Sequence, residues 1–236
     1  MVKLSAVSDT FIFIFRSLGK DPQMIWSATK DVIRNIYRAK EKEFTSAINN
    51  YPHKRVFFEM VRFDFVLDSQ LNVYLMEANM SPNLSSKHFA MNRLLYEQVL
   101  YSLLRLNGIL RGGISSTTLT PTSQEEAEMQ LAEKDLRVFP EECASESCAA
   151  SASACDKREC QLCKQCLASE EIEYPKMAAL EHLNRHQCAR IFPEPMTTKE
   201  ASKWKSKTYD DEETDSNKKM DQWFAGKCLL DERWCV

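Results

Sequence analysis

The stretch Val56–Ser81, VFFEMVRFDFVLDSQLNVYLMEANMS, decides the fold of the first half of this chain. Two apolar runs flank the polar tripeptide Asp68–Gln70, and this pattern is typical of a β-hairpin. If the turn is centred between Gln70 and Leu71, Asp64 lies opposite Glu77 and Arg62 lies opposite Asn79.

Strand side chains alternate between two faces, so the residues of the hairpin can be sorted. One face is predicted to be core: Val61, Phe63, Phe65, Leu67, Tyr74, Met76, Ala78 and Met80. The other face is predicted to combine a polar open end with an apolar floor near the turn: Arg62, Asp64, Glu77 and Asn79, then Val66, Val73 and Leu75.

The polar end of the second face indicates a metal site. Two carboxylates directly opposite each other on antiparallel strands repel. A divalent cation reverses the sign of that interaction, and Mg²⁺ prefers oxygen ligands such as those of Asp64, Glu77 and Asn79. The apolar floor could receive a flat base, so a nucleotide–metal site is one interpretation. The other is an acidic, solvent-facing sheet in which Arg62 is the counter-ion.

The same residues resemble a known family. The pattern FE-x-x-x-FDF at Phe58–Phe65, a short turn, and L-x-E-x-N-x-SP at Leu75–Pro82 are similar to the last metal-binding hairpin of the tubulin–tyrosine-ligase-like family of ATP-grasp enzymes. The resemblance implies ATP and Mg²⁺ as cofactors. It also implies catalytic, metal-ligating roles for Asp64, Glu77 and Asn79.

The resemblance further implies an activity. Members of this family are ATP-dependent ligases that join an amino acid to a protein carboxylate through an acyl phosphate. The polyglutamylase branch is the most similar, so glutamate and the acidic tails of tubulin are the expected substrate and partner. Leu75 would pack against the adenine, or would be ordinary core. The expected location is cytoplasmic and cytoskeleton-associated, although the parent protein could carry an upstream membrane anchor.

The resemblance covers only the last part of the family's catalytic region. The upstream lysines and arginines that bind phosphates and substrates are missing, so the chain is expected to be a C-terminal fragment that is inactive by itself. A different class of function stays open: a non-catalytic, zinc-stapled binding module or an inactive truncated isoform.

Composition removes several classes of function. The net charge of −3 shows no basic excess, so we expect no nucleic-acid partner. No apolar run is long enough for a membrane span. The chain has 5 glycines and no Walker-type or dinucleotide-binding glycine motif. Bound ATP would therefore have to be held by side chains and strands.

The predicted fold class is α+β: a partial ATP-grasp C-terminal lobe followed by a Cys-rich, partly disordered appendage. Residues 1–110 form the ligase part, with a buried strand at Phe11–Phe15 and helices from Pro22 to about Phe44 and from Arg93 to Leu106. Residues 111–158 form a flexible linker, 159–195 a Cys/His-rich helical segment, and 196–236 an acidic, Lys-rich tail. The apolar end of that tail, around Trp223 and Trp234, is expected to dock onto a folded part.

Cysteines and histidines in the third segment have the spacing of a zinc site. Cys163 and Cys166 precede a predicted helix with His182 and His186 on one face, and together they would give the four ligands of a closed, structural Zn²⁺ site. Cys160 and Cys188 are spare candidates. Reduced, unligated thiols are one alternative, and disulfides in an oxidising compartment are the other.

Overall fold

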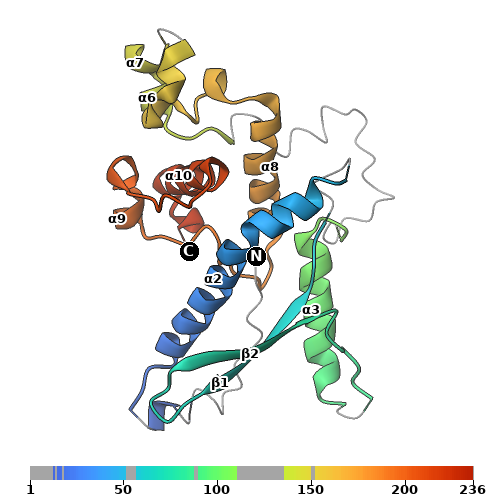
Figure 1. The fold of residues 1–236 in the computed structure, drawn as a ribbon. Helices are drawn as coiled ribbons and strands as arrows, with labels where there is room; N and C mark the ends of the chain where they lie inside the picture. Colours follow the sequence, from blue (N-terminus) through green and yellow to red (C-terminus); the bar gives the residue numbers. More distant parts are fainter. Residues whose placement is uncertain are drawn as a thin grey trace. The chain divides into compact units, whose positions relative to one another are not determined.

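The computed structural model describes residues 13, 15–17, 19–51, 57–87, 90–110, 136–149 and 152–235 (Figure 1). The chain divides into two compact units. One contains residues 3–103 and the other contains residues 104–236 together with 1–2. The first unit is mixed α and β, and the second is helical and rich in cysteine.

The first unit contains the long helix α2, Pro22–Ile48. Asp21 caps it, because its carboxylate accepts a hydrogen bond from the backbone N–H of Gln23 at 2.9 Å. One face is buried through Ile25, Thr29 and Ile33, which are spaced four residues apart. The predicted start of the helix is confirmed, and its end lies one turn beyond the prediction.

The hairpin consists of β1, Val61–Leu67, and β2, Val73–Met80, paired antiparallel. The backbone N–H of Asp68 donates to the carbonyl of Asn72 at 3.2 Å, which closes the turn. The predicted pairing is confirmed at the open end, where Asp64 faces Glu77. Between Asp64 and Phe65 the register shifts, so that Met76 is unpaired and forms a β-bulge.

Because of the bulge, the side chains near the turn lie on other faces than predicted. Phe65 now pairs with Leu75, which places Leu75 on the face of Phe65 and not on the face of Asp64. Tyr74 instead pairs with Val66, and its side chain is 53% exposed. The predicted core face is also wrong for Met76 and Met80, which are 68% and 70% exposed.

Helix α2 covers the face of the hairpin that carries Phe63. The ring of Tyr37 from α2 meets the ring of Phe63 edge-on, with centroids 6.2 Å apart. Figure 1 shows the hairpin between α2 and the helix α3, Asn92–Leu106. Gly108 follows the end of α3 in a left-handed conformation with φ 71°.

The N-terminal strand prediction is not supported where the structure describes it. Phe13 and Phe15 both lie in helical backbone, and Phe13 is 72% exposed. The rest of the predicted strand at Phe11–Phe15 lies outside the described residues.

The second unit is built from short helices and two longer ones. Its elements are α6 Pro140–Ala144, α7 Glu146–Ala149, η2 Ala152–Asp156, η3 Arg158–Cys160, η4 Lys164–Cys166, α8 Ser169–Asn184, α9 Thr198–Ala201, η5 Trp204–Ser206, α10 Asp215–Leu230 and η6 Glu232–Trp234. Residues 140–149 and 152–158 of the predicted linker are therefore folded. Residues 111–135 lie outside the described part.

An aromatic core holds this unit together. Phe139 stacks on Trp204 with centroids 3.8 Å apart, and the indole N–H of Trp223 donates to the carbonyl of Leu136 at 2.7 Å. Gly226 of α10 lies directly against Val138, where a Cβ atom would come within 2.5 Å of the Val138 Cβ. The apolar end of the chain thus packs into a core, as its composition predicts.

Within the described ranges, every helix is too short or too polar to cross a bilayer.

Candidate metal and nucleotide site

Asp64, Glu77 and Asn79 come together at the open end of the hairpin. Asp64 and Glu77 are directly paired across the strands. The side-chain amide of Asn79 donates to Glu77 Oε1 at 2.9 Å and to Asp64 Oδ2 at 3.3 Å. The three predicted ligands therefore lie on one face, as the sequence indicated.

The guanidinium of Arg62 also binds this group. Its Nε donates to Asp64 Oδ1 at 2.8 Å and its Nη2 donates to Asp64 Oδ2 at 3.0 Å. This bidentate pair lowers the pKa of Asp64 and raises the pKa of Arg62. Both side chains are solvent-accessible, 50% for Arg62 and 36% for Asp64, so water screens the interaction and Arg62 can move away at little cost.

The donor set suits a hard cation. Two carboxylates and one amide are the oxygen ligands that Mg²⁺ prefers, and phosphate oxygens and water complete such sites. In the described structure the Asn79 amide fills the space between the two carboxylates. Turning that amide over would present its oxygen to a metal, and amide orientation is set by the surrounding hydrogen bonds. The chemistry of these residues therefore fits Mg²⁺.

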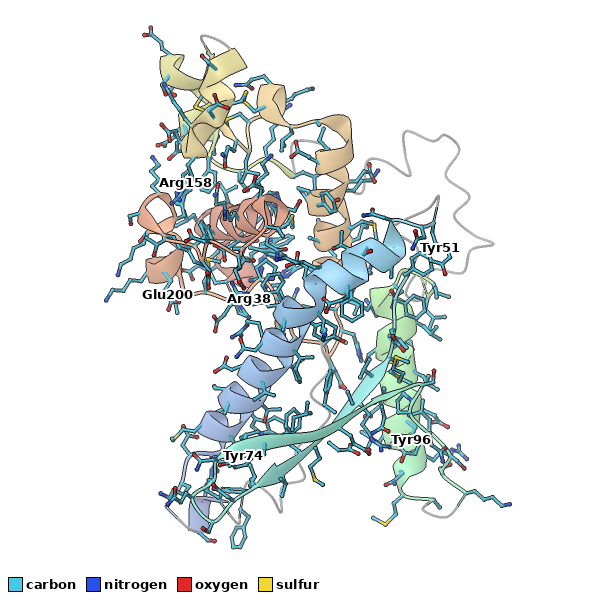
Figure 2. All side chains as sticks on the ribbon, viewed as in Figure 1. Arg38, Tyr51, Tyr74, Tyr96, Arg158 and Glu200 are labelled. Carbon is cyan, nitrogen blue, oxygen red and sulfur yellow. A yellow bond between two sulfur atoms is a disulfide. The ribbon has the colours of Figure 1, made fainter. Side chains whose placement is uncertain are left out.

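The apolar floor beside this site differs from the prediction. Val73 and Leu75 lie on the opposite face because of the bulge at Met76. Val66, 47% exposed, and Tyr74 are the apolar side chains on the carboxylate face. Leu75 is thus not placed to pack against a nucleotide on that face, and Tyr74 is the aromatic residue that the sequence analysis missed. Figure 2 shows Tyr74 on the hairpin.

Helix α3 adds a second residue that sequence reasoning missed. Tyr96 interacts electrostatically with Arg62 and so raises its pKa, although less than Asp64 does. The amide of Asn92, one turn earlier on α3, donates to the Tyr96 hydroxyl at 3.4 Å. Figure 2 shows Tyr96 on α3. No short-range sequence pattern links α3 to the hairpin, so this contact could not be read from spacing.

The predicted zinc ligands are not brought together. Cys163 is bonded to Cys143, and Cys166 is bonded to Cys155, so neither sulfur is a thiolate. His182 stacks on the ring of Trp234 at 3.8 Å.

The two histidines do not share a helix face, and the spare cysteine ligand Cys160 is not free. Helix α8 ends at Asn184, so His186 lies beyond it, with φ 49°, and does not share a helix face with His182. The spare candidate Cys160 is bonded to Cys148. Among the described residues no cluster of three or more histidine, cysteine or acidic side chains is placed to hold a metal. The structure instead forms disulfides, the last of the alternatives that the sequence left open.

Residues 8–116 match the model of the Tubulin-tyrosine ligase family, a range that contains the whole hairpin. The chain is 33% identical over 223 residues to a Caenorhabditis elegans protein named "Probable tubulin polyglutamylase ttll-15".

The coverage of that match is uneven. It takes in 92% of this chain but 40% of the relative, so the chain spans less than half of the relative's length. No solved structure matches the chain significantly.

The hairpin with its paired carboxylates lies within the matched range. The similarity to the Caenorhabditis elegans relative points to the same family. Over residues 8–116 the chain matches the tubulin-tyrosine ligase family, and the relative named as a probable tubulin polyglutamylase agrees with that match.

Proposed function

We propose that this chain carries the Mg·ATP-binding hairpin of a ligase that joins glutamate to carboxylates on an acidic protein segment. The observation that carries the proposal is the pairing of Asp64 with Glu77, with Asn79 between them. This is the one place in the first unit's sheet where two acidic side chains face each other among the described pairs.

In this proposal the three side chains act by position. Asp64, Glu77 and the amide oxygen of Asn79 would hold Mg²⁺, which would also bind phosphate oxygens. The bound ion would neutralise charge as the γ-phosphoryl group of ATP moves to the acceptor carboxylate. The amino group of glutamate then displaces phosphate from the resulting acyl phosphate, and an amide bond forms.

The name of the relative supports glutamate as the amino acid and tubulin as the acceptor to test first. On that basis the tubulin tail is the first acceptor to test in an assay with purified proteins. Because the chain spans 40% of that relative, the rest of the nucleotide and acceptor sites would come from residues that have no counterpart here. We therefore expect the 236-residue chain alone to bind Mg·ATP weakly and to show no turnover.

The experiment places the chain behind the upstream ligase region of the relative and measures incorporation of labelled glutamate into tubulin. We expect Asp64→Asn and Glu77→Gln each to lower incorporation by at least about a hundredfold, because each removes a metal ligand. Glu97→Gln is the matched control, since Glu97 lies on α3 and pairs with the exposed Arg93. Wild-type turnover in Glu77→Gln would remove Glu77 from the mechanism.

A non-catalytic binding module is the second candidate. The observation that favours it is the bidentate contact of Arg62 with Asp64, which satisfies that carboxylate without a metal. The two candidates separate by calorimetry with Mg²⁺ and ATP on the fused protein: the ligase binds and Glu77→Gln weakens binding, whereas the module shows no Glu77-dependent heat.

A further inference from the structure

The cysteines of the second unit form an interleaved set of disulfides. Three bridges connect residues within 143–166: Cys143–Cys163, Cys148–Cys160 and Cys155–Cys166. Their Cα atoms are 5.4, 5.3 and 5.3 Å apart, which is the ordinary separation for this bond. Each cysteine of the C-x₂-C-x₂-C run thus has a partner from the preceding short helices.

These bridges are also the core of their segment. The buried cluster there consists of Cys148, Ala154, Cys160 and Cys163, with Cys143 and Cys166 packed against it. No large aliphatic or aromatic side chain belongs to this cluster. A segment this short cannot bury enough apolar surface to hold its fold, and small domains of this kind depend on disulfides.

A fourth bridge lies at the end of the chain. Cys228 of α10 is bonded to Cys235, and the two residues are 0% and 4% exposed. Eight of the 9 cysteines are therefore in disulfides, and the ninth, Cys188, is buried. Such a pattern is rare in proteins of the reducing cytosol and common in secreted and lumenal ones.

An independent feature of the first unit points to the same compartment. Asn83-Leu84-Ser85 is an N-x-S acceptor triplet for N-linked glycan. Asn83 is exposed, and its side-chain oxygen accepts a hydrogen bond from the backbone N–H of Ser85 at 2.8 Å. That contact makes an Asx turn, which holds the amide on the surface of an open loop.

A second N-x-S triplet is placed differently. Asn79-Met80-Ser81 begins with a residue that is half-buried and bonded to Glu77 and Asp64. We therefore expect Asn79 to stay unmodified. Both triplets belong to the unit that carries the ligase hairpin.

We propose that this chain matures in the oxidising lumen of the secretory pathway, where its four disulfides form and Asn83 receives an N-linked glycan. Residues 111–135, which separate α3 from the Cys-rich segment in the sequence, have too many polar residues to cross a membrane, so the hairpin and the disulfides share that compartment. The inference does not rest on the proposed ligase activity. It does bear on the acceptor, which in the lumen would be an acidic segment of a lumenal or secreted protein and not the tubulin tail.

The first test measures the state of the thiols in cells that express the natural protein. Cells are quenched in acid, free thiols are blocked with N-ethylmaleimide in denaturant, and the remaining cysteines are reduced and tagged with polyethylene glycol maleimide. We expect eight cysteines of this chain to gain a tag and Cys188 to be blocked. Blocking of all nine before reduction would overturn the proposal.

The second test measures the glycan in the same cells by the gel shift after treatment with peptide N-glycosidase F. We expect a shift equal to one glycan that disappears in Asn83→Gln and in Ser85→Ala. Ser86→Ala is the matched control, because it changes the neighbouring hydroxyl and keeps the triplet. Absence of a shift in the wild-type protein would overturn the assignment of Asn83.

Neither the thiol measurement nor the glycan measurement depends on the proposed ligase activity. A reduced, unglycosylated chain that still glutamylates tubulin would overturn the lumenal location and support the proposed function. An oxidised, glycosylated chain without ligase activity on any acidic protein would support the lumenal location and overturn the proposed function.

Discussion

The guanidinium of Arg62 contacts both carboxylate oxygens of Asp64, at 2.8 and 3.0 Å. Its positive charge lies where a divalent cation would have to approach the same carboxylate. Arg62 is therefore a competitor for the proposed metal as well as a stabiliser of the ionised acid.

Replacing Arg62 with glutamine separates these two effects. The pKa of Asp64, lowered mainly by its hydrogen bonds with Arg62, should rise toward its ordinary value in Arg62→Gln. Affinity for Mg²⁺ near neutral pH should increase by about threefold to tenfold, because a like charge has been removed.

The sign of the pH effect follows from that shift. In the wild type the stabilisation from ionised Asp64 is present above the ordinary pKa and is lost as pH falls through the lowered one; in the variant this pH-dependent contribution shrinks, because the folded pKa approaches the unfolded one. Carboxyl ¹³C NMR and Mg²⁺ calorimetry provide the measurements. Arg93→Gln is the control, and an unchanged Asp64 pKa would contradict the assignment.

The turn of the hairpin should depend on Asp68. Its carboxylate accepts hydrogen bonds from the backbone N–H groups of Gln70 and Asn72 at 2.9 and 2.8 Å. In Asp68→Ala these donors lose their acceptor, so amide exchange at Leu71 and in the adjoining strand ends should become faster. Asp68→Asn keeps an acceptor oxygen and should retain most of the protection. Equal exchange in both variants would show that the carboxylate does not order the turn.

Gly226 should tolerate no side chain. A Cβ there would lie 2.5 Å from the Cβ and 2.8 Å from the Cγ1 of Val138. Alanine is a better helix former than glycine, yet Gly226→Ala should lower the free energy of unfolding of the second unit by about 1–3 kcal/mol, because overpacking outweighs propensity.

Denaturant titration followed by tryptophan fluorescence measures this loss. In a Val138→Gly background the added cost of Gly226→Ala should shrink, since the Cβ and Cγ1 atoms that would clash are gone. Ser216→Ala, at an exposed position of the same helix, is the control for a simple substitution in α10. Additive effects of the two core changes would mean that the residues do not meet.

His182 should make the second unit sensitive to acid. Burial lowers its pKa to about 4, with further lowering by the positive charges of Arg185, Arg190 and Lys227, and with an opposing contribution from Asp231. The folded pKa lies below the unfolded one, so the stability present above pH 6.5 is lost as pH falls toward 4.

The expected loss is about 2 kcal/mol between pH 7 and pH 4.5, from a pKa shift of this size. His182→Phe keeps a ring against Trp234 and should remove that part of the pH dependence, measured from denaturation midpoints across this range. His186→Asn, at an exposed position, should leave it in place. A pH profile that is the same in His182→Phe and in the wild type would show that His182 does not cause the acid sensitivity.

The open end of the hairpin could be predicted from sequence, but its turn end could not. Alternation and the position of the polar tripeptide were enough to pair Asp64 with Glu77. The turn itself closes between Asp68 and Asn72, which centres it on Gln70, half a residue from the predicted centre. The strands reconcile the two registers by leaving Met76 unpaired, and this depends on the left-handed backbone of Leu71, φ 70°.

The zinc prediction failed for a different reason. The spacing of Cys163, Cys166, His182 and His186 satisfies a zinc rule, but spacing does not reveal which other thiols lie nearby. Three cysteines in the predicted linker, at 143, 148 and 155, lie in short helices that bring each of them to a cysteine of the later run. The six cysteines between Cys143 and Cys166 are an even number, and this was the signal that would have favoured bridges.

The unpaired Met76 divides the hairpin into two ladders that can vary separately. Residues on the turn side can be exchanged, or the turn rebuilt, without changing which carboxylate faces Glu77, because the bulge absorbs the difference in register. Deleting Met76 would join the ladders into one, and any later change of turn length would then be transmitted to the acidic pair. The one extra residue, Met76, thus keeps the pairing of Asp64 with Glu77 independent of the geometry of the turn.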